Sequence, residues 1–251
     1  MAKVLSGART ERSADEAMAG LISDWLSFWD RPNSIYVSSR HRDVHYRLIA
    51  EQIVAFVPAP DACVLDYGSG EALHADIVAD SAGELLLSDG APRVCAGLAA
   101  RFVRHAKIRA LTPEDVERLP DHCVDLIVLH SVAQYLTRGQ TQTLFALFRR
   151  LLKSGGMMLV GDVIPPNVSS ATTAAALLRF GAVNGFLFAA LRGLVRTAFS
   201  DYRRMCSSFG LASYTETAMR ELLAGAGFAA ERTAKNLGHD QTRCAFVARP
   251  Q

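Results

Sequence analysis

The residues best suited to chemistry lie in one short stretch, "VLDYGSGEA", residues 64–72. An apolar run ends at Asp66, and Gly68 and Gly70 follow at once. Glycines leave backbone amides unblocked, a helix start favours electron-rich groups, and the carboxylate can meet a cationic or hydrogen-bonding group. The pattern therefore predicts a nucleotide-like binding site. Leu73 stands where the dinucleotide fingerprint G-x-G-x-x-G needs its third glycine, which disfavours pyrophosphate.

Three further side chains follow apolar runs or turns where a ligand could meet them. Asp89 ends "LLLSDG" about twenty residues after the glycine turn, Asp115 lies in "EDVERLP", and His130 comes directly after "VDLIVL". Histidine is the side chain best matched to proton removal near neutral pH. Each residue also has a structural interpretation: Asp89 and Asp66 as helix caps, Asp115 as a turn former, and His130 as a satisfied polar group.

Composition excludes several classes of protein. The 251 residues are half hydrophobic, enough for one large α/β domain or one domain with a lid. Lys and Arg total 27 against 25 Asp and Glu, so the charge of a nucleic-acid binder is missing. We expect no nucleic-acid partner. The N-terminus lacks the apolar segment of a signal peptide, and no stretch reaches the roughly 18 apolar residues of a membrane span, so we expect a cytoplasmic protein.

The five cysteines are odd in number, widely spread and free of ligand spacing: Cys63, Cys95, Cys123, Cys206 and Cys244. They are typical of reduced thiols. No cluster of Asp, Asn and Glu suggests a bound cation, so we expect no metal site and metal-independent chemistry.

The elements that must position these residues follow from hydrophobic periodicity. Helical spacing runs from Met18 to Trp29 after a capping box at Ser13 and Glu16, and again over 41–58. Short apolar runs then alternate with helical segments near 71–80, 91–105, 114–118 and 139–153. The runs "CVLDY", "ELLLSD", "KIRAL", "VDLIVL" and "GMMLVGD" predict a parallel sheet built of βαβ units.

The end of the chain changes this pattern. "SYTETAMRELLAGAGF" predicts a helix with a capping box at Ser213 and Glu216. "FAAERTAKN" and "TRCAFVARP" then predict two antiparallel strands. His239 lies at the tip between them, where we favour a side chain that faces water.

Together these motifs resemble the class I S-adenosylmethionine-dependent methyltransferases, over about Val44 to Pro250. "VLDYGSGEA" looks like the family's first motif, with Ala72 where a third glycine is more common; "VDLIVLHSVAQYL" and "RRLLKSGGMMLVGD" resemble its fourth and fifth strands with their helices. The resemblance implies that the first motif holds the methionine half of S-adenosylmethionine, Asp89 the ribose hydroxyls, and Asp115 with the Val116 backbone the adenine. The implied cofactor-binding residues are Asp66, Gly68, Ser69, Gly70, Asp89, Gly90, Asp115, Val116 and His130.

The resemblance also implies an α/β fold: a Rossmann-like, doubly wound, mostly parallel seven-stranded sheet with an antiparallel C-terminal hairpin and a helical lid insertion. Residues 1–60 would form N-terminal helices covering the cofactor cleft, 61–164 and 210–251 the core, and 165–209 the lid, in one compact domain. In the family the helix before the first strand folds over the cofactor, which makes Tyr36, Arg40 and Tyr46 candidate contacts. A solvated charged face is the alternative.

The segment after the fifth strand carries apolar side chains at helical spacing, with Arg192 and Arg196 one turn apart. A substrate lid, core packing, a homodimer interface and peripheral membrane contact, the last two through residues 171–200, all remain open. Gly181, Gly185 and Gly193 indicate bends or close packing.

The resemblance implies methyl transfer, an in-line displacement in which the protein mainly aligns the nucleophile and excludes water. His130 is the candidate general base, with a structural contact as the alternative. "HSVAQY" replaces the Asn-Pro-Pro-aromatic stretch used on planar amino groups. We therefore expect O- or C-methylation of a small, lipophilic or aromatic acceptor. The alternatives are a noncatalytic S-adenosylmethionine-binding subunit and a nicotinamide oxidoreductase.

Overall fold

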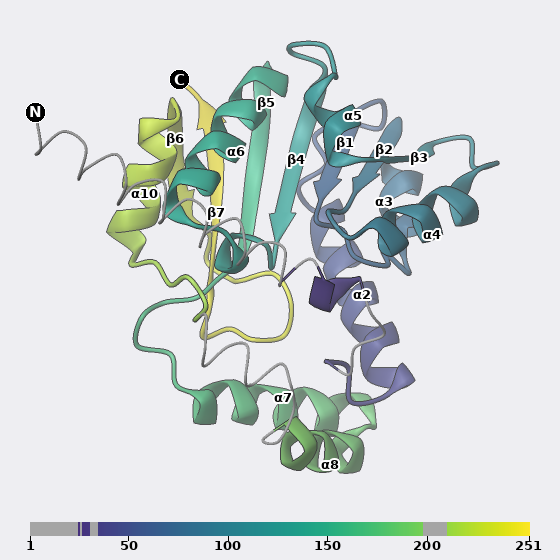
Figure 1. Ribbon diagram of the computed structural model, residues 1–251, viewed down its shortest axis with the longest axis vertical. Coiled ribbons are helices and arrows are strands. Elements are labelled where there is room, and N and C mark those ends of the chain that lie inside the picture. Colours follow the sequence, from purple (N-terminus) through teal and green to yellow (C-terminus); the bar gives the residue numbers. More distant parts are fainter. Residues whose placement is uncertain (1–24, 26, 31–34, 198–209) are drawn as a thin grey trace, which may run out of the picture.

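A seven-stranded sheet forms the centre of the computed structural model, which describes residues 25, 27–30, 35–197 and 210–251 (Figure 1). The strand order is β3-β2-β1-β4-β5-β7-β6. Strands β1 to β5 are parallel, and β7 runs antiparallel to both β5 and β6. The predicted fold class and both predicted C-terminal strands are confirmed. The strands are β1 (Cys63–Tyr67), β2 (Glu84–Ser88), β3 (Ile108–Leu111), β4 (Val124–His130), β5 (Leu152–Val163), β6 (Phe228–Arg232) and β7 (Cys244–Pro250).

Helices cover both faces of this sheet. One core cluster joins the strands to α2 (Ser39–Val54), α3 (Ala75–Ser81) and α4 (Pro92–Phe102). The other joins them to α5 (Pro113–Glu117), α6 (Arg138–Leu151) and α10 (Glu216–Gly225). Neighbouring strand residues such as Val64 and Leu65 are both fully buried but belong to opposite clusters. Burial on both faces explains why these strands are apolar without alternation.

Capping side chains correct two of the expected helix boundaries. Helix α10 begins at Glu216 because the Thr215 hydroxyl accepts from the Ala218 amide at 3.1 Å, so the expected capping box at Ser213 is wrong. Helix α2 covers 39–54 rather than 41–58, because the Ser38 hydroxyl accepts from the His41 amide at 3.1 Å. A serine or threonine that precedes a helix can accept from an otherwise unpaired amide of its first turn. Where several such residues stand near a helix start, the sequence alone does not show which one is the cap.

The last three strands depart from expectation in length. Strand β5 begins at Leu152, four residues earlier than predicted, because Leu152 already pairs with Val124 before a shift in register. Strand β6 ends at Arg232, and the connection to β7 spans residues 233–243. This long connection brings His239 back over the end of the sheet.

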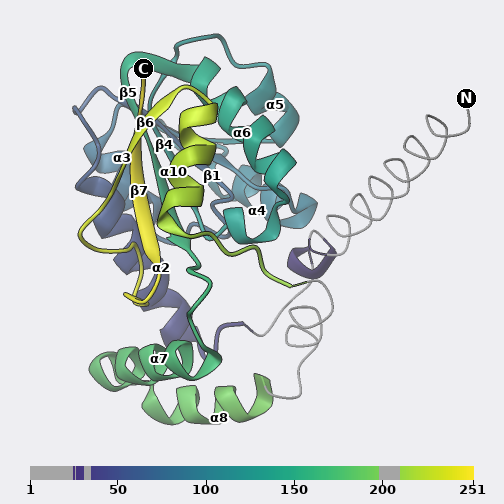
Figure 2. The same ribbon diagram turned by 90° about the vertical axis from the view of Figure 1, so that its left-hand side faces the viewer.

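Helices α7 (Ser170–Asn184) and α8 (Leu187–Thr197) form a pair beyond the end of the sheet toward which β4 points (Figures 1 and 2). Gly185 adopts a left-handed φ of +76° at the turn between them. A Cβ on Gly181 would lie 3.2 Å from the Ala190 Cβ, and one on Gly193 would overlap Val37. The glycines therefore serve one bend and two close approaches, as predicted.

Some expectations fall outside the described residues. Of the helix expected from Met18 to Trp29, the structure describes residues 25 and 27–29, which are helical. Cys206 and the segment 198–209 are likewise not described. Within the described residues, none of the helices combines the length and apolarity needed to cross a membrane.

Candidate functional site

The glycine turn after β1 lies at the carboxyl end of the sheet, and its amides are held by hydrogen bonds within the protein. Gly68 and Gly70 have φ values of +79° and +58°, a region that favours glycine. The amides of Gly68 and Ser69 donate to the Ser88 carbonyl at 2.7 and 3.0 Å. Space is also restricted, since a Cβ on Gly70 would lie 2.6 Å from the Tyr46 Oη. Both glycines are required by conformation and by close approach.

Asp89 ties this turn to the end of β2. Its Oδ2 accepts from the Gly70 amide at 2.9 Å, and its Oδ1 accepts from the Ala91 amide at 2.8 Å. Gly90 lies between Asp89 and Ala91 in the chain. Burial raises the pKa of Asp89, and the two amide hydrogen bonds oppose that effect. Each carboxylate oxygen keeps a further lone pair, so the group can still accept from two hydroxyls.

Asp66, the second-last residue of β1, is half-buried and close enough to Asp89 to feel its charge. Burial, and then the negative charge of Asp89, raises the pKa of Asp66 to about 7. A carboxyl in this state gains from a cation nearby, because a positive charge favours its ionised form. The two acids thus form a site that a positively charged group would stabilise.

A small cavity of about 50 Å³ lies beside Asp66. Tyr46, Ser69 and His130 contribute polar groups to its wall, and α2, α3 and the strands contribute apolar side chains. Cavities of this volume hold a few water molecules, whereas ligand pockets span roughly 300 to 1,000 Å³. A nucleoside cofactor must therefore lie mostly outside it or displace side chains of α2.

Tyr46 is the α2 residue that contacts the turn directly. Its Oη accepts from the Glu71 amide at 3.0 Å, and its ring lies 5.8 Å from that of Tyr36. Burial raises the pKa of both phenols, so both are neutral. Arg40 lies elsewhere: its Nε donates to the Asn184 carbonyl at the end of α7. The structure brings Tyr46 and Tyr36, but not Arg40, to the turn.

Asp115 and Val116 have structural partners of their own. The Asp115 Oδ2 accepts from the Thr112 amide and hydroxyl in a capping box, and Oδ1 accepts from Arg118 at 3.3 Å. The Val116 amide donates to the Thr112 carbonyl at 3.0 Å. An adenine contact to either residue would share or displace these bonds, and it stays a prediction.

His130 ends β4 and faces the same cavity as Asp66. Burial lowers the pKa of His130, so its ring is neutral near pH 7 and able to accept a proton. Its Nδ1 is buried and has no hydrogen-bond partner among the described residues. A Cβ on Gly161 would lie 2.8 Å from this Nδ1, so the neighbouring strand also leaves room for the ring.

A polar network that the sequence did not predict borders His130. Ser131 and Asp162 have left-handed φ values of +58° and +63°. The Ser131 hydroxyl donates to Asp162 at 2.6 Å, and Arg243 donates to the same carboxylate oxygen at 2.8 Å. Non-glycine residues held in this region cluster at functional sites. The network fixes the backbone on both sides of the His130 ring.

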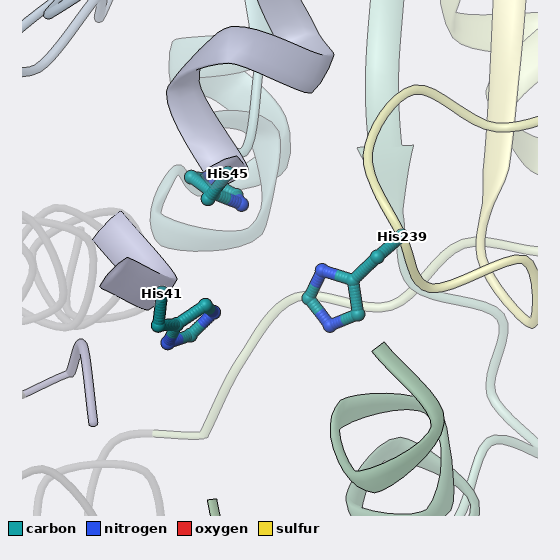
Figure 3. A group of neighbouring side chains, drawn as sticks. All are labelled: His41, His45 and His239. Carbon is teal, nitrogen blue, oxygen red and sulfur yellow. The ribbon is translucent and has the colours of Figure 1, made fainter. Parts of the chain in front are cut away.

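Three further histidines gather at this end of the sheet. His41 and His45 come from α2 and His239 from the loop before β7 (Figure 3). The expectation that His239 faces water is wrong: its ring stacks on Phe180, with centroids 4.5 Å apart and planes at 11°. Burial lowers the pKa of His239. This packing could not be predicted from the sequence, because His239 and Phe180 belong to segments far apart in the chain.

Comparison with known proteins agrees with this geometry. The family model described as "Methyltransferase domain" matches residues 65–160, which include the glycine turn, Asp89 and His130. No curated protein sequence shows significant similarity to the chain.

Several solved structures share the fold. Magnesium protoporphyrin IX methyltransferase from Synechocystis PCC 6803, with bound SAH, is 14% identical with a TM-score of 0.58, over 95% of this chain and 100% of that one. Mitomycin 7-O-methyltransferase is 18% identical with a TM-score of 0.56, over 82% and 54% of the two chains. An O-methyltransferase from neocarzinostatin biosynthesis, in complex with S-adenosyl-L-homocysteine and 1,4-dihydroxy-2-naphthoic acid, is 16% identical with a TM-score of 0.56, over 84% and 56%.

Proposed function

Because this chain carries a class I S-adenosylmethionine-dependent methyltransferase domain, we propose that it transfers the cofactor's methyl group to oxygen or carbon of a small organic acceptor with lipophilic or aromatic character. The single observation that carries this proposal is the wall of rings facing the carboxyl end of β4. Phe180 stacks on His239 and Phe186 stacks on His41. The His45 ring, with its centroid 6.1 and 6.2 Å from those of the two histidines, lies 6.5 Å from the ring of His130.

The two acids are proposed to hold the cofactor. Asp89 would accept from the ribose hydroxyls while it orders Gly70, and Asp66 would lie near the cationic half, where its raised pKa makes it sensitive to positive charge. Gly68, Ser69 and Gly70 would let that half approach the backbone. The cofactor supplies an electrophilic methyl group when bound; the chain's own residues position it and keep water out.

The acceptor would lie between the cofactor and the α7–α8 pair. A third apolar cluster forms there, with Val44, Phe186 and Ala190 buried at its centre and Phe180 packed against it. Apolar and aromatic rings bury a flat organic molecule well but leave a charged one unsatisfied. This supports a lipophilic acceptor, and residues 165–209 are proposed as its lid.

His130 is proposed to take the proton of an acceptor hydroxyl. Its ring faces the cavity beside Asp66 and is neutral near pH 7. An imidazole held in this way can accept a proton as the oxygen attacks the methyl carbon.

Two of the similar structures support the same class of acceptor. One is mitomycin 7-O-methyltransferase, and the other is an O-methyltransferase in complex with 1,4-dihydroxy-2-naphthoic acid. We extend from them only the general character of the acceptor, a small ring compound.

The outer side of the α7–α8 pair supports the predicted partner contact through residues 171–200. Four apolar side chains are exposed there: Val183, Phe188, Leu191 and Val195. Exposed apolar groups at such density suit a homodimer interface or a membrane surface.

Methyl-labelled S-adenosylmethionine tests the proposed function. The tag-free protein would be incubated with labelled cofactor and a fractionated small-molecule extract. Label is expected in an apolar small-molecule fraction, and at a cofactor concentration below the Kd it should fall at least tenfold with the Asp89→Asn protein. Label in protein or nucleic acid alone, or equal label with the variant, would contradict the proposal.

A further inference from the structure

We propose that His41, His45 and His239 bind one divalent zinc ion, at the end of the sheet where His130 lies. One ring nitrogen from each residue lies within 4.8 Å of the other two. The three rings form a nearly equilateral triangle, with centroids 6.1, 6.1 and 6.2 Å apart (Figure 3). The sequence predicted no metal site. His41 and His45 have the four-residue spacing of zinc ligands on one helix, but His239 lies 194 positions after His45 in the chain.

The unpaired nitrogens of this cluster favour a ligand. The His41 Nε2 and the His45 Nδ1 are buried and lack a hydrogen-bond partner among the described residues. A buried polar atom without a partner costs free energy, and a metal ion removes that cost by accepting the lone pair. The triangle thus contains two buried ring nitrogens that have no partner among the described residues and could bind a metal ion.

The residue types suit a metal ion. Histidine is a common metal ligand, and it binds through a neutral imidazole nitrogen. Three histidines with an open fourth position are typical of zinc.

The three ligand nitrogens must move closer together to bind one zinc ion. Zinc–nitrogen bonds of 2.0 to 2.1 Å in tetrahedral geometry place ligand nitrogens about 3.4 Å apart. The nitrogens, which lie within 4.8 Å of one another, must therefore move closer by up to about 1.4 Å. If His41 binds through Nε2, its ring proton moves to Nδ1, so the 3.3 Å contact from the Val37 amide to Nδ1 would be lost. That contact is long and therefore weak.

Aromatic packing holds the ligands in place. His41 stacks on Phe186 with centroids 4.9 Å apart, and His239 stacks on Phe180. The His45 ring lies 6.5 Å from that of His130. A bound ion would therefore join α2, the loop before β7 and, through stacking, the α7–α8 region, close to the proposed base. The site shares His41 and His239 with the wall of rings proposed to face the acceptor, and zinc binding can be measured without any acceptor present.

Metal titration of tag-free, chelator-treated protein tests the site. Cobalt(II) is the optical probe, and zinc is added in competition and measured by calorimetry. We expect one equivalent to bind with a Kd below about 1 µM, with the visible absorption of four-coordinate cobalt and without thiolate charge-transfer bands. No binding in this range, or a thiolate band from one of the free cysteines, would overturn the proposal.

Matched variants assign the ligands. His239→Phe keeps a ring against Phe180 but removes the nitrogen, and His45→Gln keeps a polar group without an imidazole. Each should weaken zinc binding at least 100-fold while S-adenosylmethionine binding and the melting temperature stay close to those of the parent. His105→Asn is the control, because His105 is exposed and its Nδ1 accepts from backbone amides. Equal zinc affinity in His239→Phe and His105→Asn would contradict the site, whatever the methyl-transfer assay shows.

Discussion

The carboxylate of Asp89 accepts a 2.9 Å hydrogen bond from the amide of Gly70, nineteen residues earlier in the chain. This bond joins the end of β2 to the turn after β1, and a second bond from the Ala91 amide fixes the other carboxylate oxygen. One side chain therefore orders the glycine turn and presents lone pairs beside it. Structure and proposed binding depend on the same group.

Replacing Asp89 should damage both roles. Asp89→Asn leaves one acceptor oxygen where two amides now donate, so we expect S-adenosylmethionine to bind at least tenfold more weakly and the protein to lose about 1 to 2 kcal/mol of unfolding free energy. Calorimetric titration and urea unfolding measure these effects. Asp80→Asn, on the exposed end of α3, is the control and should change neither quantity. Matching behaviour of the two variants would remove Asp89 from the site.

Asp66 should make cofactor binding depend on pH. Its pKa is raised from 3.8 to about 7, so the folded protein holds this proton more tightly than the unfolded chain does. Without cofactor, ionisation of Asp66 lowers the free energy of unfolding as pH rises from about 4 to about 7. A bound cation favours the ionised carboxyl. Affinity should therefore rise up to about tenfold per pH unit below pH 7 and level off above it.

Calorimetry between about pH 5.5 and 8.5 measures this dependence. Asp66→Asn is the matched control, since an amide does not titrate over that range. It should bind more weakly at pH 8 and show a flatter profile. A wild-type affinity that stays constant across the range would show that Asp66 does not sense the cofactor's charge.

Gly70→Ala should be destabilising because of both backbone conformation and space. The residue has a φ of +58°, and the added Cβ would lie 2.6 Å from the Tyr46 Oη. We expect a loss of roughly 1 to 3 kcal/mol and no measurable cofactor binding. Gly97→Ala is the matched control: Gly97 lies in α4 with open space around it, and alanine there should add about 0.5 to 1 kcal/mol. Thermal unfolding distinguishes the two, and equal melting temperatures would contradict the reasoning.

His130→Ala should separate binding from turnover. The ring is proposed to accept a proton from the acceptor, so removal should lower kcat by about a hundredfold or more while cofactor affinity stays within a few-fold. The pH dependence of kcat is a second measurement. If His130 is the base, the fall of kcat at low pH should be absent from the His130→Ala protein. Unchanged turnover would leave His130 as a structural residue only.

The sequence predicted the sheet well because each strand carries its own signal. Apolar runs such as residues 64–65 and 126–129 are buried on both faces, so local composition is enough to identify them. Asp66 and Asp89 were also predictable, since acids that end two neighbouring parallel strands must meet at one edge. Helix starts were harder, because Ser213 and Thr215 are equally good caps and tertiary packing chooses between them.

The histidine triangle could not be predicted from local pattern. His41 and His45 are one helical turn apart and looked like part of a charged, solvated face, while His239 looked like a loop tip. Their environment depends on how the connection 233–243 and the α7–α8 pair return over the end of the sheet. Such long-range placement leaves no periodic trace in the sequence.

The most direct test of the central claim is a pair of calorimetric titrations of the same protein sample, one with S-adenosylmethionine and one with NADH. The two acids and the glycine turn without a third glycine predict micromolar binding of S-adenosylmethionine and no detectable heat from NADH. Binding of NADH alone would contradict the account.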